Sequence, residues 1–411
     1  MTGPNRASAA LALGSVISGL LAYVLFALIT RGLGAGDAAP VTVLWTHWAF
    51  TGAAFTFPLQ HWITRSLVAG RESAVRRAAP RLSLFVGAAA LVLGGLSWLA
   101  RDDLFHREDP WFPVMIALIT VGSALIGVVR GGLGGRGRFE AVAWSLVAEN
   151  GLRCVLVAGL LVAGVTSPVA HGLCLVAGQL VVVLWPSALR YAKAVVTRVQ
   201  ESDSPFAFLS GAAVAQLISQ AILTGGPVLL ALSGGSPSEV TAMFAALALF
   251  RAPYMIALGS VPQLTLRVTE RTLAGEYAAL RTMIRGVLGA TVLTVVLAGL
   301  LGAWVGPSLL RLVFGHTVDV TATDASLLAI GCALAIANLA LMVIALGQDR
   351  PASVARAWAI ATAVGALGFV ALTSASPVES TIGAFLTAEV AALVALSVAT
   401  VRATRSAGSR A

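Results

Sequence analysis

Residues 112–130 read FPVMIALITVGSALIGVVR, an uninterrupted apolar run that ends at Arg130. A helix that crosses the hydrocarbon core of a bilayer needs about 20 mostly apolar residues, and this stretch has that length. An acidic segment, 101–111, precedes the run, and a basic segment, 130–138, follows it. The stretch therefore predicts a transmembrane helix with differently charged surroundings at its two ends.

The whole chain has the same character. Of its 411 residues, 58% are hydrophobic and 11% are charged, and the mean hydropathy is +0.90. Soluble globular proteins carry about 25% charged residues, so a soluble enzyme is excluded, and the apolar fraction excludes a disordered chain. The composition predicts an all-helical, polytopic integral membrane protein.

Apolar runs of membrane-spanning length predict twelve spans: 8–30, 41–62, 82–100, 112–130, 140–163, 171–190, 206–232, 239–260, 284–305, 325–347, 355–375 and 380–401. A shift of 204 positions places residues 49–67 over 253–271, which indicates two six-helix lobes related by a pseudo-two-fold axis along the membrane normal. The predicted organisation is one lobe at 1–190, a cytoplasmic linker at 191–205, a second lobe at 206–402 and a tail at 403–411.

The basic residues predict the orientation, because cytoplasmic loops are enriched in arginine and lysine. With a cytoplasmic N-terminus, 21 of the 27 basic residues, Arg130 among them, lie in cytoplasmic segments. Both termini are therefore predicted to be cytoplasmic, and the first span is expected to be a retained helix. The formal net charge of +9 is explained by this enrichment of arginine in cytoplasmic segments, so nucleic acid is not expected as a partner.

No catalytic, metal-binding or cofactor-binding motif is expected. The sole lysine, Lys193, is not part of a Gly-Lys-Ser/Thr sequence, so the chain has no P-loop for ATP. Gly132, Gly134 and Gly137 match a dinucleotide-binding pattern, but they follow a membrane helix, and we interpret 131–139 as a flexible basic turn. The three cysteines lie in apolar runs and predict neither a disulfide nor a metal site.

Charged residues inside spans are the candidate site residues, because such groups face a cavity or a partner. Glu149 and Arg153 are four residues apart and can pair on one helix face, with Asn150 beside them. This group is either a structural ion pair or a lining for an anionic substrate.

If Glu149 only positions Arg153, the substitution Glu149→Gln should reduce export less than Arg153→Ala does. Equal, complete loss of export in both variants would indicate that Glu149 couples transport to protons.

The eighth span contains a cation beside a proline. Arg251 has no acidic residue one turn away, and Pro253 removes a backbone hydrogen bond and predicts a kink that can act as a hinge. A cation that has no acidic residue one turn away and lies beside a kink favours a hydrated substrate-binding cavity. The shift of 204 places His47 at the matching position of the second span, either as a packed histidine or as part of this cavity.

Further polar residues lie in the second half of the chain. Gln216, Gln220 and Thr224 form a stripe at four-residue steps, which either lines the cavity or bonds to a neighbouring helix. Glu389 in the last span could take up a proton if buried, because loss of water disfavours a charged carboxylate, or it could pair with Arg153 or Arg251.

Two stretches resemble a known family: Gly137-Arg138-Phe139 followed by Glu149 and Arg153, and residues 232–244 continuing to Arg251-Ala252-Pro253. Together with the six-plus-six layout, they are similar to the polysaccharide flippase (Wzx-like) branch of the multidrug/oligosaccharidyl-lipid/polysaccharide (MOP) exporter superfamily. The resemblance implies alternating-access export of a polyprenyl-diphosphate-linked oligosaccharide across the bacterial cytoplasmic membrane. It implies that Arg251 and Arg153 contact the diphosphate or acidic sugars, that Glu149 positions Arg153, and that polysaccharide assembly proteins are possible partners.

Two other functions remain open at this point. A cation-coupled multidrug antiporter of the same superfamily would favour an acidic cavity for cationic drugs. A membrane glycosyltransferase or polymerase acting on a lipid-linked sugar would require a sizeable outer loop with paired carboxylates, whereas Asp102 and Asp103 lie in a short one.

Overall fold

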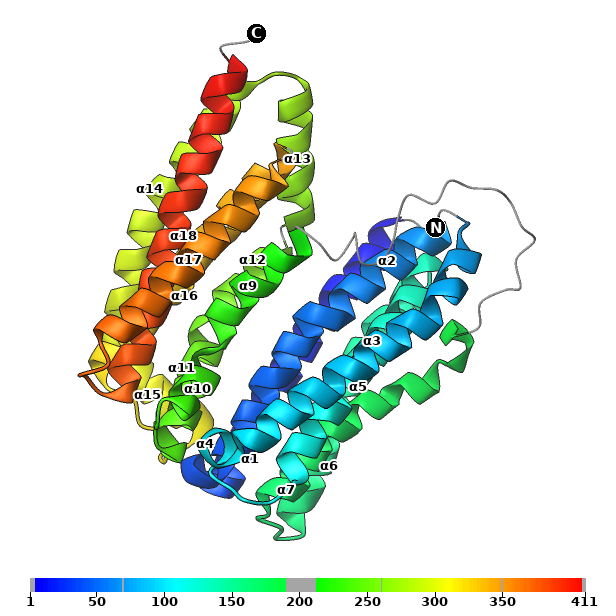
Figure 1. Ribbon diagram of the computed structural model, residues 1–411, viewed down its shortest axis with the longest axis vertical. Coiled ribbons are helices and arrows are strands. Elements are labelled where there is room, and N and C mark those ends of the chain that lie inside the picture. The colour runs from blue at the N-terminus through cyan, green and yellow to red at the C-terminus, as the bar shows by residue number, and fades with distance from the viewer. Residues whose placement is uncertain (1–3, 69, 190–211, 260, 349, 409–411) are drawn as a thin grey trace. The chain divides into compact units, whose positions relative to one another are not determined.

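The computed structural model describes residues 4–68, 70–189, 212–259, 261–348 and 350–408, and these ranges are helical and contain no β-strand (Figure 1). The chain forms two compact units. Unit 1 comprises residues 1–213 with 236–238, and unit 2 comprises residues 214–235 with 239–411. The predicted all-helical class is confirmed, and the predicted linker 191–205 lies outside the described residues.

Unit 1 is built from helices that enclose a central helix, α5. Helix α5 packs against α1, α2 and α3 and is the most buried of the candidate membrane spans in this unit. The elements of unit 1 are α1 (Pro4–Thr51), the π-helix η1 (Gly52–Thr56), α2 (Phe57–Val68), α3 (Glu72–Leu99), α4 (Arg101–Phe105), α5 (Trp111–Gly135), α6 (Phe139–Val162), α7 (Pro168–Ala177) and the 3-10 helices η2 (Gly178–Leu184) and η3 (Pro186–Leu189).

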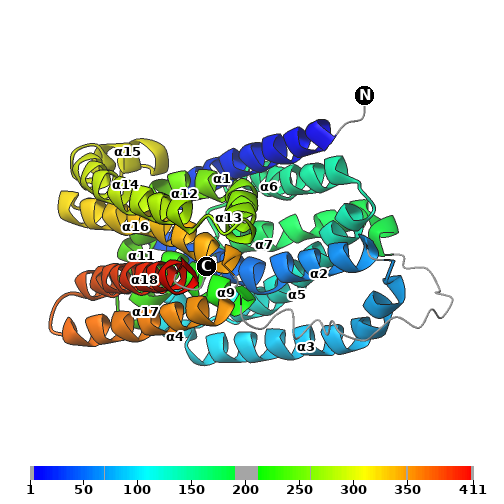
Figure 2. The same cartoon turned by 90° about the horizontal axis from the view of Figure 1, so that it is seen from above.

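Unit 2 has α16 at its centre, which packs against α14, α18 and α13 (Figure 2). Its elements are α9 (Ala212–Thr224), α10 (Gly226–Leu232), α11 (Pro237–Phe250), α12 (Ala252–Gly259), α13 (Val261–Leu273), α14 (Tyr277–Trp304), α15 (Gly306–Phe314), α16 (Ala322–Gly347), α17 (Pro351–Ala371) and α18 (Pro377–Gly408). Since α18 continues to Gly408, the first part of the predicted tail 403–411 is helical.

The helices follow many of the predicted spans, but the first two spans are joined, and the predicted span 171–190 is the short helix α7 followed by the 3-10 helices η2 and η3. Eight described segments are long and apolar enough to cross a membrane, or nine if the bent pair α11 and α12 forms one span. One segment, Ala10–Val68, contains both the span at 8–30 and the span at 41–62. The helix breaks between them at Gly34, whose φ of 76° is accessible to glycine without steric cost. One residue therefore replaces the loop that we expected there.

Helix α13 lies in a segment that the sequence predicted as a basic loop. Val261, Leu264 and Val268 recur at helical spacing on one side, and Val268 is buried. Polar residues, among them Gln263, Thr265 and Arg267, alternate with these apolar positions, and Glu270 and Arg271 follow, so the helix is amphipathic and its average hydropathy is low. A search for continuous apolar runs misses such a helix.

Glycines at four-residue steps form one face of α5: Gly127, Gly131 and Gly135. A Cβ atom at Gly127 would overlap the backbone of Thr56, and one at Gly131 would overlap the side chain of Ile63. Small residues allow membrane helices to approach closely in this way. We call this contact between α5 and η1–α2 the glycine seam.

The prediction of a flexible turn at 131–139 is wrong for the first half of this segment. Helix α5 continues to Gly135, because its glycines pack against α2. The turn itself is short: Gly137 has a φ of 70°, and α6 begins at Phe139.

Candidate functional site

The interior of unit 1 contains a buried triad of charged side chains, Arg130, Glu149 and Arg153. Nη2 of Arg153 donates to Oε1 of Glu149 at 2.7 Å, and Nη2 of Arg130 donates to Oε2 at 2.6 Å. The predicted pairing of Glu149 with Arg153 is therefore confirmed. One carboxylate faces two guanidinium groups, so the triad carries one net positive charge.

Arg130 is the member that the sequence assigned to a cytoplasmic segment next to the end of its span. It lies within α5, is 6% exposed, and donates from Nε to Oγ of Ser145 on α6 at 3.0 Å. The sequence contained one sign that Arg130 lies inside a helix: the residues that follow it as far as Gly135 are uncharged, which allows the helix to continue past the arginine.

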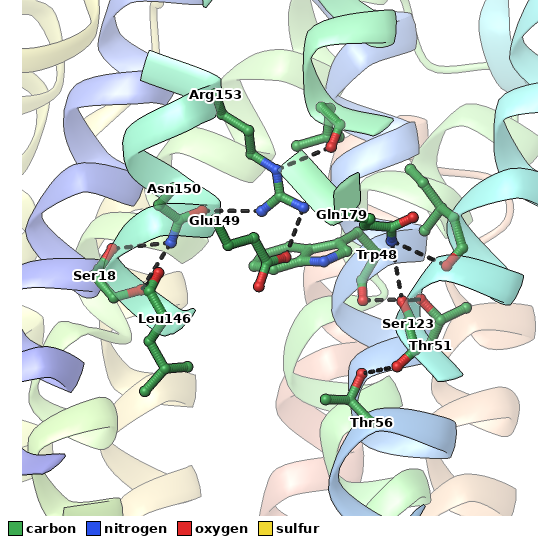
Figure 3. Close-up of polar contacts among 12 residues, drawn as sticks. Ser18, Trp48, Thr51, Thr56, Ser123, Leu146, Glu149, Asn150, Arg153 and Gln179 are labelled. Carbon is green, nitrogen blue, oxygen red and sulfur yellow. Dashed lines mark hydrogen bonds and ion pairs between the residues drawn. The ribbon is translucent and has the colours of Figure 1, made fainter. Parts of the chain in front are cut away.

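Arg153 is fully enclosed. Its exposed fraction is 0%, Nε donates to the carbonyl oxygen of Leu175 at 2.9 Å, and Nη1 donates to Oδ1 of Asn150 at 2.9 Å (Figure 3). Its Cζ lies 4.5 Å from the ring centroid of Trp48, which adds a cation–π contact. In this conformation Arg153 has no exposed surface with which to bind a substrate.

Two neighbours fix the position of Arg153. Asn150 donates from Nδ2 to the carbonyl oxygen and the Oγ of Ser18 at 3.0 and 2.9 Å, which joins α6 to α1. Gly178 leaves room for the arginine side chain, since a Cβ atom at this position would overlap Nε, Cγ and Cδ of Arg153. A glycine in an apolar run was the only sequence sign of this close approach.

A second polar cluster surrounds the π-helix η1 (Figure 3). Thr51 and Ser123 share a hydrogen bond of 2.9 Å between their hydroxyl oxygens, and Thr56 donates to the carbonyl oxygen of Ser123 at 2.8 Å. Gln179 donates from Nε2 to Oγ of Ser123 at 3.4 Å. Single-turn π-helices often occur at functional sites, so this cluster is a candidate hinge.

His47 forms a contact between α1 and α5. Its Nε2 lies 3.0 Å from Oγ1 of Thr120, and the Thr120 hydroxyl donates to the carbonyl oxygen of Ile116 at 2.8 Å. Because that hydroxyl proton is used, Thr120 accepts and His47 donates. His47 is 8% exposed, so this geometry matches the packed histidine of the two alternatives.

In unit 2, the eighth span is broken at Arg251. Helices α11 and α12 meet there at an angle of 45°, two residues before Pro253. Proline lacks the N–H that would continue the hydrogen-bond ladder, which explains the break. Arg251 is half-buried, and its Cζ lies 5.8 Å from the ring centroid of Phe244.

The polar stripe of α9 contacts α12. Gln220 donates from Nε2 to the hydroxyl oxygen of the buried Tyr254 at 2.9 Å, and its backbone carbonyl accepts from Oγ1 of Thr224 at 2.7 Å. Interhelical bonding, one of the two expected roles of the stripe, thus occurs at Gln220. The side chain of Gln216 lies outside the described residues.

Glu389 on α18 and Asn338 on α16 form a fully buried polar pair. Nδ2 of Asn338 donates to Oε2 of Glu389 at 2.7 Å and to the Glu389 carbonyl oxygen at 2.9 Å. Among the described residues, Oε1 of Glu389 and Oδ1 of Asn338 have no hydrogen-bond partner. Both are acceptors when the carboxylate is charged, and buried polar atoms are normally paired. The pair therefore lacks one donor.

The predicted site residues thus form separate groups. Glu149, Asn150 and Arg153 lie together in unit 1, and His47 occupies another place in the same unit. Gln220, Arg251 and Glu389 belong to unit 2. The hydrogen-bond partners of the Arg153 side chain, Leu175, Asn150 and Glu149, all belong to unit 1.

No family model and no curated protein matches the sequence. Solved structures do match the fold. An inward-facing multidrug resistance MATE family transporter of the MOP superfamily aligns over 95% of this chain and 98% of its own, with 15% identity and a TM-score of 0.65. A MOP superfamily transporter from Pyrococcus furiosus, reported to have a binding pocket of reverse polarity, aligns over 99% of this chain and 96% of its own, with 16% identity and a TM-score of 0.58.

A eukaryotic MATE transporter aligns over 99% of this chain and 98% of its own, with 18% identity and a TM-score of 0.55. At these identities the likeness shows the fold. The chain is a multi-pass membrane protein with a twelve-helix, two-lobe fold like that of these transporters, so the predicted fold class is confirmed.

Proposed function

We propose that this protein is a cation-coupled exporter of the multidrug antiporter type, in which entry of a proton drives exit of an organic solute. The observation that carries the proposal is the buried Glu389–Asn338 pair with its missing donor. A proton on Oε1 of Glu389 supplies a donor for Oδ1 of Asn338. When a change of conformation admits water, the carboxyl can release that proton, because a hydrated carboxylate no longer requires a partner.

The state of Arg153 favours this function over flipping of a lipid-linked sugar. The flippase hypothesis uses Arg153 and Arg251 as partners of an anionic diphosphate. Arg153 instead has its donors directed at Glu149, Asn150 and a backbone carbonyl, inside a fully buried site. The solved structures of similar fold include proteins described as multidrug transporters, which supports the antiporter type.

The broken helix in unit 2 supports a transport cycle of alternating access. Substrate and ion sites of secondary transporters are commonly formed at discontinuous membrane helices. The 45° bend between α11 and α12 is such a discontinuity, and Pro253 is the proposed hinge, since it prevents a continuous ladder of hydrogen bonds.

The test uses the purified chain reconstituted in liposomes with an acidic lumen and ethidium outside. We expect ethidium uptake well above that of protein-free liposomes, accompanied by alkalinisation of the lumen, and both should stop when an ionophore collapses the pH gradient. Uptake driven by a sodium gradient alone would show that the coupling ion is not the proton. The antiport hypothesis is wrong if no ion gradient changes the uptake.

Arg251 supports a second candidate function, the flipping of a polyprenyl-diphosphate-linked oligosaccharide, because it is a half-buried cation at a helix break. In this case Arg251→Ala should abolish transfer of a fluorescent polyprenyl-diphosphate sugar between the leaflets of a proteoliposome. Arg285→Ala, which removes an exposed arginine of the same unit, is the control and should retain transfer. If the wild-type protein does not transfer the lipid, or Arg251→Ala transfers it normally, Arg251 is not a diphosphate ligand.

A further inference from the structure

An apolar groove of about 940 Å³ lies between α17 and α18 of unit 2. The two helices run side by side (Figure 1, Figure 2). Exposed side chains of Ile360, Val390, Val394 and Val398 border the groove. From Leu386 to Arg402 its α18 wall extends for about 24 Å at 1.5 Å per residue, comparable to an extended acyl chain.

Three arginines, Arg350, Arg356 and Arg402, line one end of the same groove. Helix α17 begins at Pro351 and α18 continues past Arg402, so the antiparallel arrangement brings these residues together. All three are exposed, and none of the described residues that line the groove is acidic. The positive end of the α17 macrodipole adds to the positive potential there.

We propose that this groove binds one phospholipid with a net negative headgroup. Its acyl chain would lie along the valine-lined wall, and its phosphate would contact the arginines, whose planar guanidinium groups match phosphate oxygens. The basic residues place this end of the groove on the predicted cytoplasmic side, where anionic lipids attract clustered arginine. A zwitterionic headgroup carries an additional cation that the three arginines repel, so we expect selectivity for net charge.

This proposal is independent of the transported substrate, because the groove is formed by α17 and α18 and includes neither Arg251 nor Glu389. The test measures lipid binding to the purified full-length chain by native mass spectrometry, with phosphatidylglycerol and phosphatidylcholine of identical acyl chains. We expect phosphatidylglycerol to bind more tightly. The variant R350Q/R356Q/R402Q should lose about 100-fold in phosphatidylglycerol affinity, and its phosphatidylcholine affinity should change little.

The control variant R267Q/R281Q/R285Q removes three other exposed arginines of unit 2 and the same total charge. It should retain the phosphatidylglycerol affinity of the wild type. Equal binding of the two lipids by the wild-type chain would overturn the proposal, because the groove would then not select for net charge. An equal loss in both triple variants would also overturn it, because binding would then depend on overall charge and not on the three arginines of the groove.

The apolar part of the groove has its own variant. Val394 is 58% exposed, so Val394→Trp should fold normally and obstruct the groove while the arginines remain. Phosphatidylglycerol affinity should fall at least as far as in the triple arginine variant. Unchanged affinity in Val394→Trp and in a second variant, Val390→Trp, would show that the acyl chain lies elsewhere. A dimer that excludes lipid would make a second copy of the chain the occupant and would equally overturn the proposal.

Discussion

The substitution Glu149→Gln is expected to lower the free energy of unfolding by about 3–5 kcal/mol, the range found when one partner of a buried ion pair is removed. Glu149 is the only carboxylate in contact with Arg130 and Arg153 among the described residues, so Glu149→Gln leaves two buried guanidinium groups without a counter-charge. We therefore expect this variant to be at least as strongly destabilised as Arg153→Ala. The measurement is unfolding by sodium dodecyl sulfate in mixed micelles.

The control is Glu140→Gln, which makes the same change at an exposed position in the first turn of the same helix and should lower the free energy of unfolding by at most about 1 kcal/mol. A double variant, Glu149→Gln with Arg130→Gln, restores the original net charge of the site and should recover part of the lost stability. Equal unfolding free energies for Glu149→Gln and Glu140→Gln would contradict the prediction, because they would show that the triad does not stabilise the unit. Loss of transport in Glu149→Gln is thus not sufficient evidence for proton coupling at this carboxylate.

Replacement of Glu389 by glutamine should abolish proton-driven uptake in reconstituted liposomes and leave the protein folded. A glutamine amide can accept from Nδ2 of Asn338 and donate to Oδ1, so it reproduces the hydrogen bonds of a protonated glutamic acid. It cannot release a proton, however. We expect uptake by Glu389→Gln to fall to that of protein-free liposomes, with a thermal midpoint equal to or above that of the wild type.

Glu379→Gln is the matched control, since Glu379 is an exposed residue in the first turn of the same helix. It should retain proton-driven uptake. Wild-type uptake and lumen alkalinisation in Glu389→Gln would show that another group carries the proton, and Glu149 would then be the next carboxylate to test. A strongly lowered thermal midpoint in Glu389→Gln would contradict the proposed protonated pair.

The parts of the fold that the sequence predicted are those decided by continuous hydrophobicity. Long apolar runs gave the positions of the spans, whereas the amphipathic α13 has too little average hydropathy to be found in this way. The join at Gly34 was also missed, because a break that depends on the backbone freedom of one glycine leaves no pattern in hydropathy.

The site was predictable only where its partners are close in sequence. Glu149 and Arg153 share a helix face, so their spacing was enough to predict the pair. Arg130 and Asn338 contact their carboxylates from other helices, and the sequence contains no information on which helix faces meet. The sequence also could not show that Arg153 is fully buried, since its enclosure by Trp48 and Leu175 arises only when the helices of the unit pack together.

The glycine seam between α5 and η1–α2 has a consequence for the evolution of this protein. Substitutions at Gly127 or Gly131 force two backbones apart, so a mutational library should be depleted of every larger residue at both positions, even under selection for membrane insertion alone. Gly151, where an added Cβ atom has no neighbour within 4 Å, should accept alanine in the same library. The seam thus defines a set of positions at which orthologous sequences can be aligned with confidence when little other similarity remains.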